Sequence, residues 1–363
     1  MPVSPVDWGL AERVAVRVSG HEPLAASYHY DRLEADFADV TARAEELVAA
    51  TTGLRSASGP ARARVVDRAD WVRANLASFG RLLRPLTDKM AERRGDKRGL
   101  AAMPAALSRR AAGIEVGTLL GWMASRVLGQ YDLLVIEDED PDDQDIVYYV
   151  GPNVLALEKR YAFPPEEFRL WLALHEVTHR AQFTGVPWLR PHFLLLVERT
   201  LDAVDPDPKQ FLDALGRLIE DLRSGNNPLD EGGLATLLAS PDQRELFGRI
   251  GGLMSLLEGH GDVTMDRAGE GHVPSAARFS RALRERRKQG GSVAKLLQKA
   301  LGIDAKFQQY AQGESFIAYV ERHGGPDALD AAWRGPEWLP TLSEIRAPQE
   351  WLDRVRLSEE LVG

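Results

Sequence analysis

Residues 168–183, FRLWLALHEVTHRAQF, constrain the fold more than any other stretch, because their apolar side chains recur at the spacing of one helix face. Pro165 precedes the segment and favours a helix start there, while Glu166 suits the positive first turn and Arg180 the negative end. The pattern therefore predicts one amphipathic helix. Its expected buried face consists of Leu170, Trp171, Leu174, Val177 and Thr178.

The same segment contains an H-E-x-x-H pattern formed by His175, Glu176 and His179. Residues four apart on a helix lie on one face, so both imidazoles could bind a single metal ion. Glu176 would then reach a water molecule at that ion. The alternative is a pair of histidines that are four apart without binding metal, although burying them with an acid would carry a desolvation cost.

Composition limits the class of protein. The chain has 363 residues, a net charge of −9 and no cysteine, so any metal site must use histidine and carboxylate ligands. The acidic balance argues against a nucleic-acid partner. No apolar run is long enough to span a membrane, and the first residues lack the pattern of a secretory signal. These features predict a cytoplasmic protein without a membrane partner.

Helical periodicity dominates the chain and predicts a mainly α fold of the α+β class. Residues 131–136 and 146–150 are typical of strands, and we expect them to form a small antiparallel sheet packed on the H-E-x-x-H helix. Residues 1–127 are expected to form an N-terminal helical region, and residues 128–363 the catalytic region. The periodicity also predicts a helix whose inner face runs from Val65 to Phe79.

Glycines recur every four residues at Gly113, Gly117 and Gly121 in a long apolar stretch. Small residues at this spacing allow another helix to approach closely. We therefore expect a close helix–helix contact at these glycines.

A catalytic zinc ion usually has three protein ligands, so a third is needed. The metzincin pattern is excluded, since Gln182 and Gly185 occupy the positions where it requires glycine and histidine. The best candidate is Glu258 in the run LLEGHGDVTMD. Asp262 follows four residues later and could accept a hydrogen bond from the ring nitrogen of a ligand histidine that does not bind the metal. His260 is the alternative ligand, and it would point to a different helix face.

Three runs carry a family resemblance: YVGPN at 149–153, the H-E-x-x-H segment extended to residue 190, and LLEGHGDVTMD at 256–266. Together they resemble zincin-like metallopeptidases of actinobacteria and their relatives, chains often labelled hydrolases or associated with coenzyme F420 biosynthesis. The resemblance covers most of the chain. It implies a zincin-type fold and a site for one Zn²⁺ ion, with the glutamate on a later helix as in the gluzincins.

In the mechanism that this site suggests, Glu176 is the general base for hydrolysis of a peptide or small amide. Tyr310, His260 and His272 are candidates for stabilising the oxyanion. The strand at residues 146–150, IVYYV, is the expected sheet edge for an extended peptide. Two alternatives stay open: a non-peptide amide hydrolase in cofactor metabolism, and a zinc-binding scaffold protein without turnover.

Overall fold

The computed structural model of the protein describes residues 4, 6–22, 24, 27–82, 105–132, 145–203, 241–288 and 303–362. The chain divides into two compact units. Unit 1 comprises Met1–Gly185 and Thr264–Ala282, and unit 2 comprises Val186–Val263 and Leu283–Gly363. The division expected between residues 127 and 128 concerns where the catalytic region begins, and it stays a prediction.

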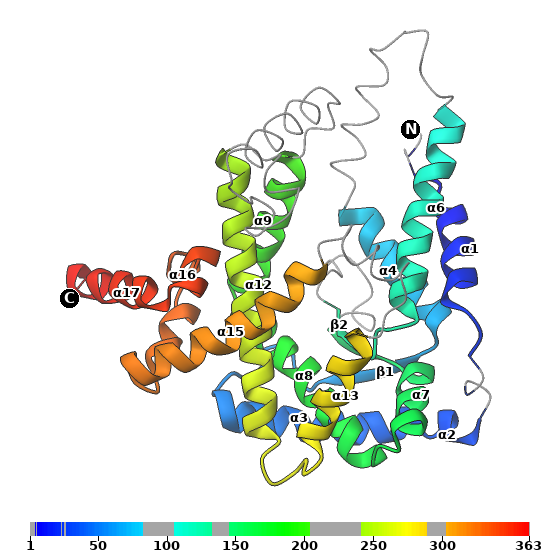
Figure 1. Ribbon diagram of the computed structural model, residues 1–363, viewed down its shortest axis with the longest axis horizontal. Helices are drawn as coiled ribbons and strands as arrows, with labels where there is room; N and C mark the ends of the chain where they lie inside the picture. Colours follow the sequence, from blue (N-terminus) through cyan, green and yellow to red (C-terminus); the bar gives the residue numbers. More distant parts are fainter. Residues whose placement is uncertain are drawn as a thin grey trace. The chain divides into compact units, whose positions relative to one another are not determined.

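Helices make up most of the described chain, which confirms the mainly α class with a small sheet (Figure 1). The first half contains α1 (Trp8–Ser19), α2 (Tyr28–Asp31), α3 (Leu33–Thr52), α4 (Arg68–Leu82), α6 (Ala105–Ala124), α7 (Gly151–Tyr161) and α8 (Pro165–Gly185). The second half contains α9 (Leu189–Ala203), α12 (Pro241–Ala268), α13 (Ala276–Lys288), α15 (Ile303–Gly324), η3 (Ala328–Trp333), η4 (Pro336–Trp338), α16 (Leu342–Arg346) and α17 (Pro348–Val362).

The sheet is mixed, with the strand order β1-β3-β2. β2 (Gly129–Tyr131) pairs antiparallel with β3 (Ile146–Val150), as the sequence predicted, and it begins two residues earlier than expected. Residues 133–136 of the expected strand lie outside the described residues. β1 (Arg62–Val66) adds a parallel strand on the other side of β3. The prediction of a purely antiparallel sheet is therefore corrected.

β1 occupies the start of a segment that periodicity had predicted as helix. Its valines suit a strand, and its main chain pairs with β3 from Arg62 opposite Ile146 to Val66 opposite Val150. The helix begins only after Asp67, whose carboxylate accepts a hydrogen bond from the Asp70 N–H at 2.7 Å. This bond is typical of a helix N-cap, so α4 starts at Arg68.

β3 is buried along its whole length, and alternate side chains enter two different cores. Ile146, Tyr148 and Val150 belong to a cluster with buried residues of α1, α4 and α6. On the opposite face, Tyr149 stacks on Phe37 of α3 with ring centroids 3.9 Å apart, and its hydroxyl is 2.9 Å from the Thr41 hydroxyl. Burial raises the pKa of Tyr149, so this phenol stays neutral and anchors α3 to the sheet.

The glycines at every fourth position of α6 lie against α1, as predicted (Figure 1, right). A methyl group at Gly117 would be 2.4 Å from the Ala11 carbonyl oxygen, and one at Gly121 would be 2.4 Å from that of Ala15. Neither distance leaves room for a side chain. The two helix backbones can therefore approach only because these positions are glycine.

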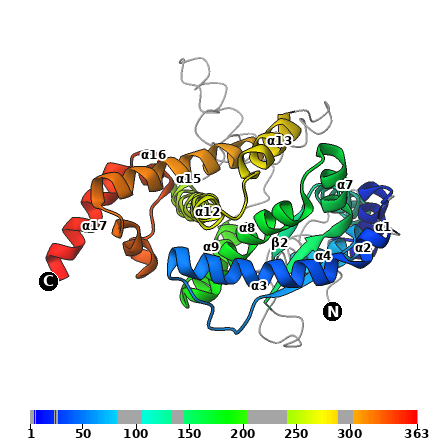
Figure 2. The same cartoon turned by 90° about the horizontal axis from the view of Figure 1, so that it is seen from below.

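α8 runs beside α3 and also contacts β2 and β3 (Figure 2). Arg169 near its start forms ion pairs with Asp36 of α3 and Glu158 of α7. Arg180 near its end is 1% exposed and bonds to Glu45 of α3 and to both oxygens of Asp145. Arg180 is therefore a buried ion-pair residue that ties α8 to α3.

In unit 2, α12 and α15 meet at two glycines. A methyl group at Gly259 would be 2.4 Å from the Gly313 carbonyl carbon. Only glycine leaves room for the partner backbone at this position. The two helices therefore cross in backbone contact.

The end of the chain is helical, with η3, η4, α16 and α17 following α15. Trp351 of α17 is fully buried, packs edge-to-face on Phe316 and donates its indole N–H to the Trp338 carbonyl at 2.8 Å. These contacts hold α17 against α15 and η4.

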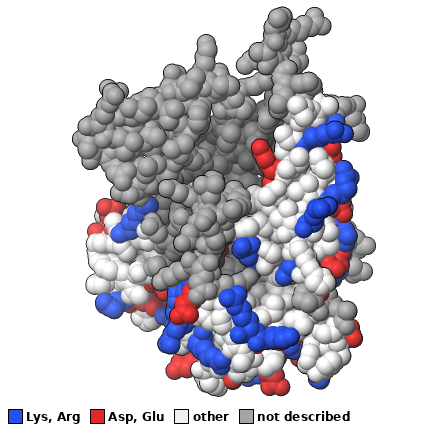
Figure 3. Space-filling view, turned by 45° about the vertical axis from the view of Figure 1, so that its right-hand side comes forward, with Lys and Arg blue, Asp and Glu red and all other residues white. Residues whose placement is uncertain are grey.

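Basic and acidic side chains of the described residues are interspersed on the face shown in Figure 3. Among the helices that the structure describes, none combines the length and apolar character needed to cross a bilayer. The expectations about nucleic acid, membrane surfaces and cellular location stay predictions.

Candidate metal centre

His175 and His179 lie one turn apart on α8 and face each other. Their Nε2 atoms are 3.2 Å apart, and their rings are nearly perpendicular, at 85°. Two nitrogens bound to one tetrahedral zinc ion at normal bond lengths would be about 3.3 Å apart. The pair therefore already has the separation that one zinc ion requires, and the predicted grouping of these histidines is present within a single helix.

The other ring nitrogen of His179 has a partner that sequence reasoning missed. His179 Nδ1 is 3.0 Å from Oε1 of Gln182, which follows three residues later and is completely buried. The sequence had shown Gln182 only as a departure from the metzincin pattern. Its spacing was the available signal, because residues three apart on a helix are neighbours.

Glu176 is buried and points to the sheet. Its Oε2 accepts a hydrogen bond from the main-chain N–H of Tyr131 at 3.2 Å. A methyl group at Gly129 would be 2.7 Å from both Cγ and Oε1 of Glu176. The carboxylate therefore lies directly against the backbone of β2.

The contact between Glu176 and β2 is on the outer edge of that strand. Asp132 N–H donates to Ile146, and Val150 N–H donates to the carbonyl of Leu128, so residues 128 and 132 bond toward β3. In an antiparallel pair the N–H and C=O groups of successive residues point alternately toward the partner strand and away from it. Gly129 and Tyr131 thus present their backbone groups away from β3, on the side where Glu176 lies.

The expected substrate strand needs a correction. β3, the IVYYV segment, is paired with β1 on one side and β2 on the other. It is the central strand, and its backbone groups are already used by its neighbours. The edges of the sheet, within the described residues, are β1 and β2.

The remaining predicted ligands come from α12. Glu258 is buried, and with the two histidines it makes a set of two imidazoles and one carboxylate that could hold a metal ion. His260 is also buried, and its ring packs edge-to-face on Trp333 at a centroid distance of 5.1 Å. Asp262, on the same helix, is half-buried. Its hydrogen bond to the second ring nitrogen of a ligand histidine stays a prediction.

The other oxyanion candidates differ in how far they can be placed. Tyr310 belongs to α15, but its side chain lies outside the described part of the structure. His272 is exposed, and its Nδ1 is 2.9 Å from a guanidinium nitrogen of Arg43 on α3. One nitrogen of that ring is therefore engaged by a surface arginine, and the oxyanion role of His272 stays a prediction.

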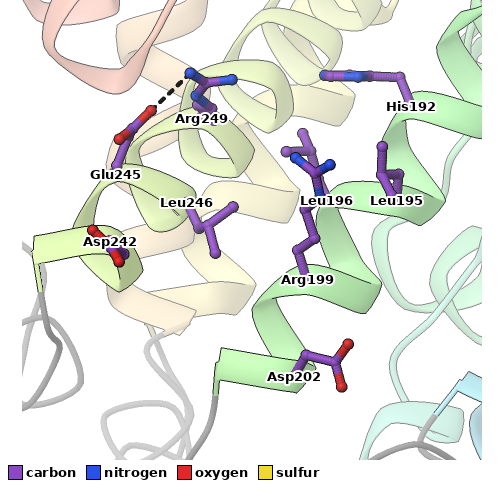
Figure 4. A pocket seen from close by; sticks show the side chains of 9 residues that line it. All are labelled: His192, Leu195, Leu196, Arg199, Asp202, Asp242, Glu245, Leu246 and Arg249. Carbon is purple, nitrogen blue, oxygen red and sulfur yellow. Dashed lines mark hydrogen bonds and ion pairs between the residues drawn. The ribbon is translucent and has the colours of Figure 1, made fainter.

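Unit 2 also contains a cleft of about 510 Å³ between α9 and α12 (Figure 4). Leucines and charged side chains line it together, and none of the predicted metal ligands is among them. Burial, together with Arg249 and Arg199, lowers the pKa of His192 at one end of the cleft. The lining residues are His192, Leu195, Leu196, Arg199, Asp202, Asp242, Glu245, Leu246 and Arg249.

Comparison with known proteins adds independent information. The family model of zincin-like metallopeptidases matches residues 6–352. A solved structure from Chloroflexus aurantiacus, described as that of a candidate hydrolase with a novel fold, is 30% identical in sequence, with a TM-score of 0.70. That similarity covers 97% of this chain and 99% of the other. None of the curated proteins compared with the chain matches it.

Proposed function

The chain belongs to the zincin-like metallopeptidase family, and from that premise we propose that it hydrolyses a peptide bond with one zinc ion. The family and the similar structure support the coarser class, a zinc-dependent hydrolase. The observation that carries the finer proposal is the 3.2 Å separation of the His175 and His179 Nε2 atoms on a helix that also holds Glu176.

His175, His179 and Glu258 are the proposed zinc ligands, a set typical of catalytic zinc sites that leave one position open. When bound, zinc would polarise the scissile carbonyl and make a water molecule more acidic. Gln182 already engages Nδ1 of His179. If Asp262 accepts a hydrogen bond from the second ring nitrogen of a ligand histidine, that histidine is therefore His175.

Glu176 is the proposed general base. In this role its carboxylate takes a proton from the attacking water and passes it to the leaving amine. The Tyr131 N–H holds one carboxylate oxygen, and Gly129 leaves space for the side chain beside the strand. The backbone of β2 thus fixes the direction of the Glu176 side chain.

The outer edge of β2 is the proposed place for the substrate main chain, in place of β3. An extended peptide could pair with this edge through the main-chain groups that Glu176 does not occupy, as other peptide-binding sheets allow. Because Glu176 contacts the same edge, a peptide there would bring its scissile bond beside the base. This relationship favours a peptide over a small amide, which could not use a strand edge.

A screen against peptide libraries and small amides tests this proposal. We expect cleavage of peptides that stops with a zinc chelator and returns when zinc is added. Turnover of small amides but of no peptide would instead support the amide hydrolase. Absence of turnover on every substrate, with zinc bound, would favour the non-catalytic scaffold.

A further inference from the structure

Gln182 is one of several polar residues buried on α8. It is completely buried on α8, where the neighbouring Ala181 and Phe183 are apolar. A buried amide costs free energy unless its hydrogen bonds are satisfied, so packing alone would favour an apolar residue there. The contact with His179 supplies a chemical reason for glutamine.

That contact determines which nitrogen of His179 carries the proton. The atom 3.0 Å from His179 Nδ1 is the amide oxygen of Gln182, which can only accept. Nδ1 must therefore be the donor, and in the neutral ring Nε2 is left with its lone pair. Nε2 is also the atom that faces His175 at 3.2 Å.

We propose that Gln182 is a positioning residue for the metal site, because its side-chain oxygen holds His179 with the proton on Nδ1 and Nε2 ready to bind zinc. This inference rests on the proposed function, since it assigns a role at the same site. Hydrogen-bonded partners behind metal-binding histidines commonly fix the tautomer and ring direction in this way.

The arrangement is built within one helix. His179 and Gln182 are three residues apart, so α8 brings them together whenever it forms. One of the two histidines is therefore oriented before any metal is bound. A histidine ring whose orientation is already fixed loses less conformational entropy when zinc binds, which favours tighter binding.

Two substitutions separate this role from simple packing. Gln182→Met has a similar length but no acceptor, whereas Gln182→Glu keeps an oxygen at the same reach. We expect Gln182→Met to bind zinc roughly 10- to 100-fold more weakly in a competition with a chromogenic chelator, the usual loss for such a partner. Gln182→Glu should stay close to the wild-type affinity.

Thr178→Val is the matched control. Thr178 is also completely buried on α8, and its hydroxyl donates to the main-chain carbonyl of Leu174 at 2.7 Å rather than to a histidine ring. This variant removes a buried polar group from the same helix, and its zinc affinity should not change. Equal losses in Thr178→Val and Gln182→Met would mean that zinc affinity reports helix stability, which would overturn the inference.

Nitrogen NMR of the metal-free protein gives a second readout. The His179 ring should carry its proton on Nδ1 in the wild type and in Gln182→Glu, and should lose this preference in Gln182→Met. A wild-type ring protonated on Nε2 would overturn the inference, as would wild-type zinc affinity in Gln182→Met. A wild-type protein that binds no zinc would instead refute the proposed function, while the NMR result would still test the hydrogen bond.

Discussion

Gly129 and Glu176 are in such close contact that a methyl group on residue 129 would be 2.7 Å from the Glu176 carboxylate. The glycine belongs to the short strand β2, and the glutamate to the helix that holds both histidines. The lack of a side chain at residue 129 therefore leaves the space that the side chain of the proposed base occupies. Gly129→Ala should displace the Glu176 side chain, because a side chain can move more easily than the strand.

For Gly129→Ala we expect turnover to fall by about tenfold to a hundredfold, the scale of a small misplacement of a catalytic group. Zinc content and melting temperature should change little. The control is Gln130→Ala, whose side chain bonds to Asn75 and not to Glu176. Kinetics of both variants on a peptide substrate provide the measurement, and equal activity of Gly129→Ala and wild type would contradict the assigned position of the base.

Glu176→Gln tests the base directly. The amide has nearly the same size and can still accept from the Tyr131 N–H, but it cannot take the proton of water. Turnover should therefore drop by roughly a hundredfold or more, while zinc content and melting temperature stay at wild-type values. A variant that retains wild-type turnover would exclude Glu176 as the base, even with zinc bound.

Metal content tests the ligand set. Elemental analysis of the purified protein should find about one zinc per chain, because two histidines and a glutamate supply three ligands. His175→Ala should lose most of that metal, and Glu258→Gln should bind it more weakly. Failure of the wild-type protein to take up zinc, even when zinc is supplied, would refute the proposed centre.

Arg180 should be important for stability. It is 1% exposed and its guanidinium bonds to Glu45 and Asp145, so Arg180→Met would leave both carboxylates without their buried partner. Breaking a buried pair in this way typically costs about 3–5 kcal/mol. Urea denaturation should show a loss of that order in the free energy of unfolding.

The exposed pair Arg249–Glu245 provides the control for Arg180. Both of these side chains are more than half exposed, so solvent screens their attraction. Arg249→Met should therefore change the free energy of unfolding by less than about 1 kcal/mol. Similar losses in Arg249→Met and Arg180→Met would show that burial does not determine the contribution of these ion pairs.

Gly259→Ala should destabilise the crossing of α12 and α15. The added methyl group would meet the backbone of Gly313, which cannot move aside as a side chain could. Forcing an extra carbon into such a contact typically costs about 1–3 kcal/mol. Gly248→Ala on the same helix has open space and should be neutral or stabilising, so melting temperatures of the two variants test the contact.

The sequence by itself determined the features that depend on local spacing. The i, i+4 geometry of a helix made the meeting of His175 and His179 predictable, and both flanking signals and apolar periodicity predicted α8. The glycine repeat in α6 likewise predicted a close helix contact, because only small residues permit it. Local geometry and side-chain size are properties that the sequence states directly.

Only the tertiary structure decided which residues from distant segments meet. Val65 and Val66 fit a helical pattern, yet pairing with β3 makes them a strand and places the IVYYV segment in the middle of the sheet. Glu176 acquires a direction from Gly129 and Tyr131, which are more than forty residues earlier in the chain. Strand pairing and contacts across long separations depend on the whole chain folding at once, and no local pattern specifies them.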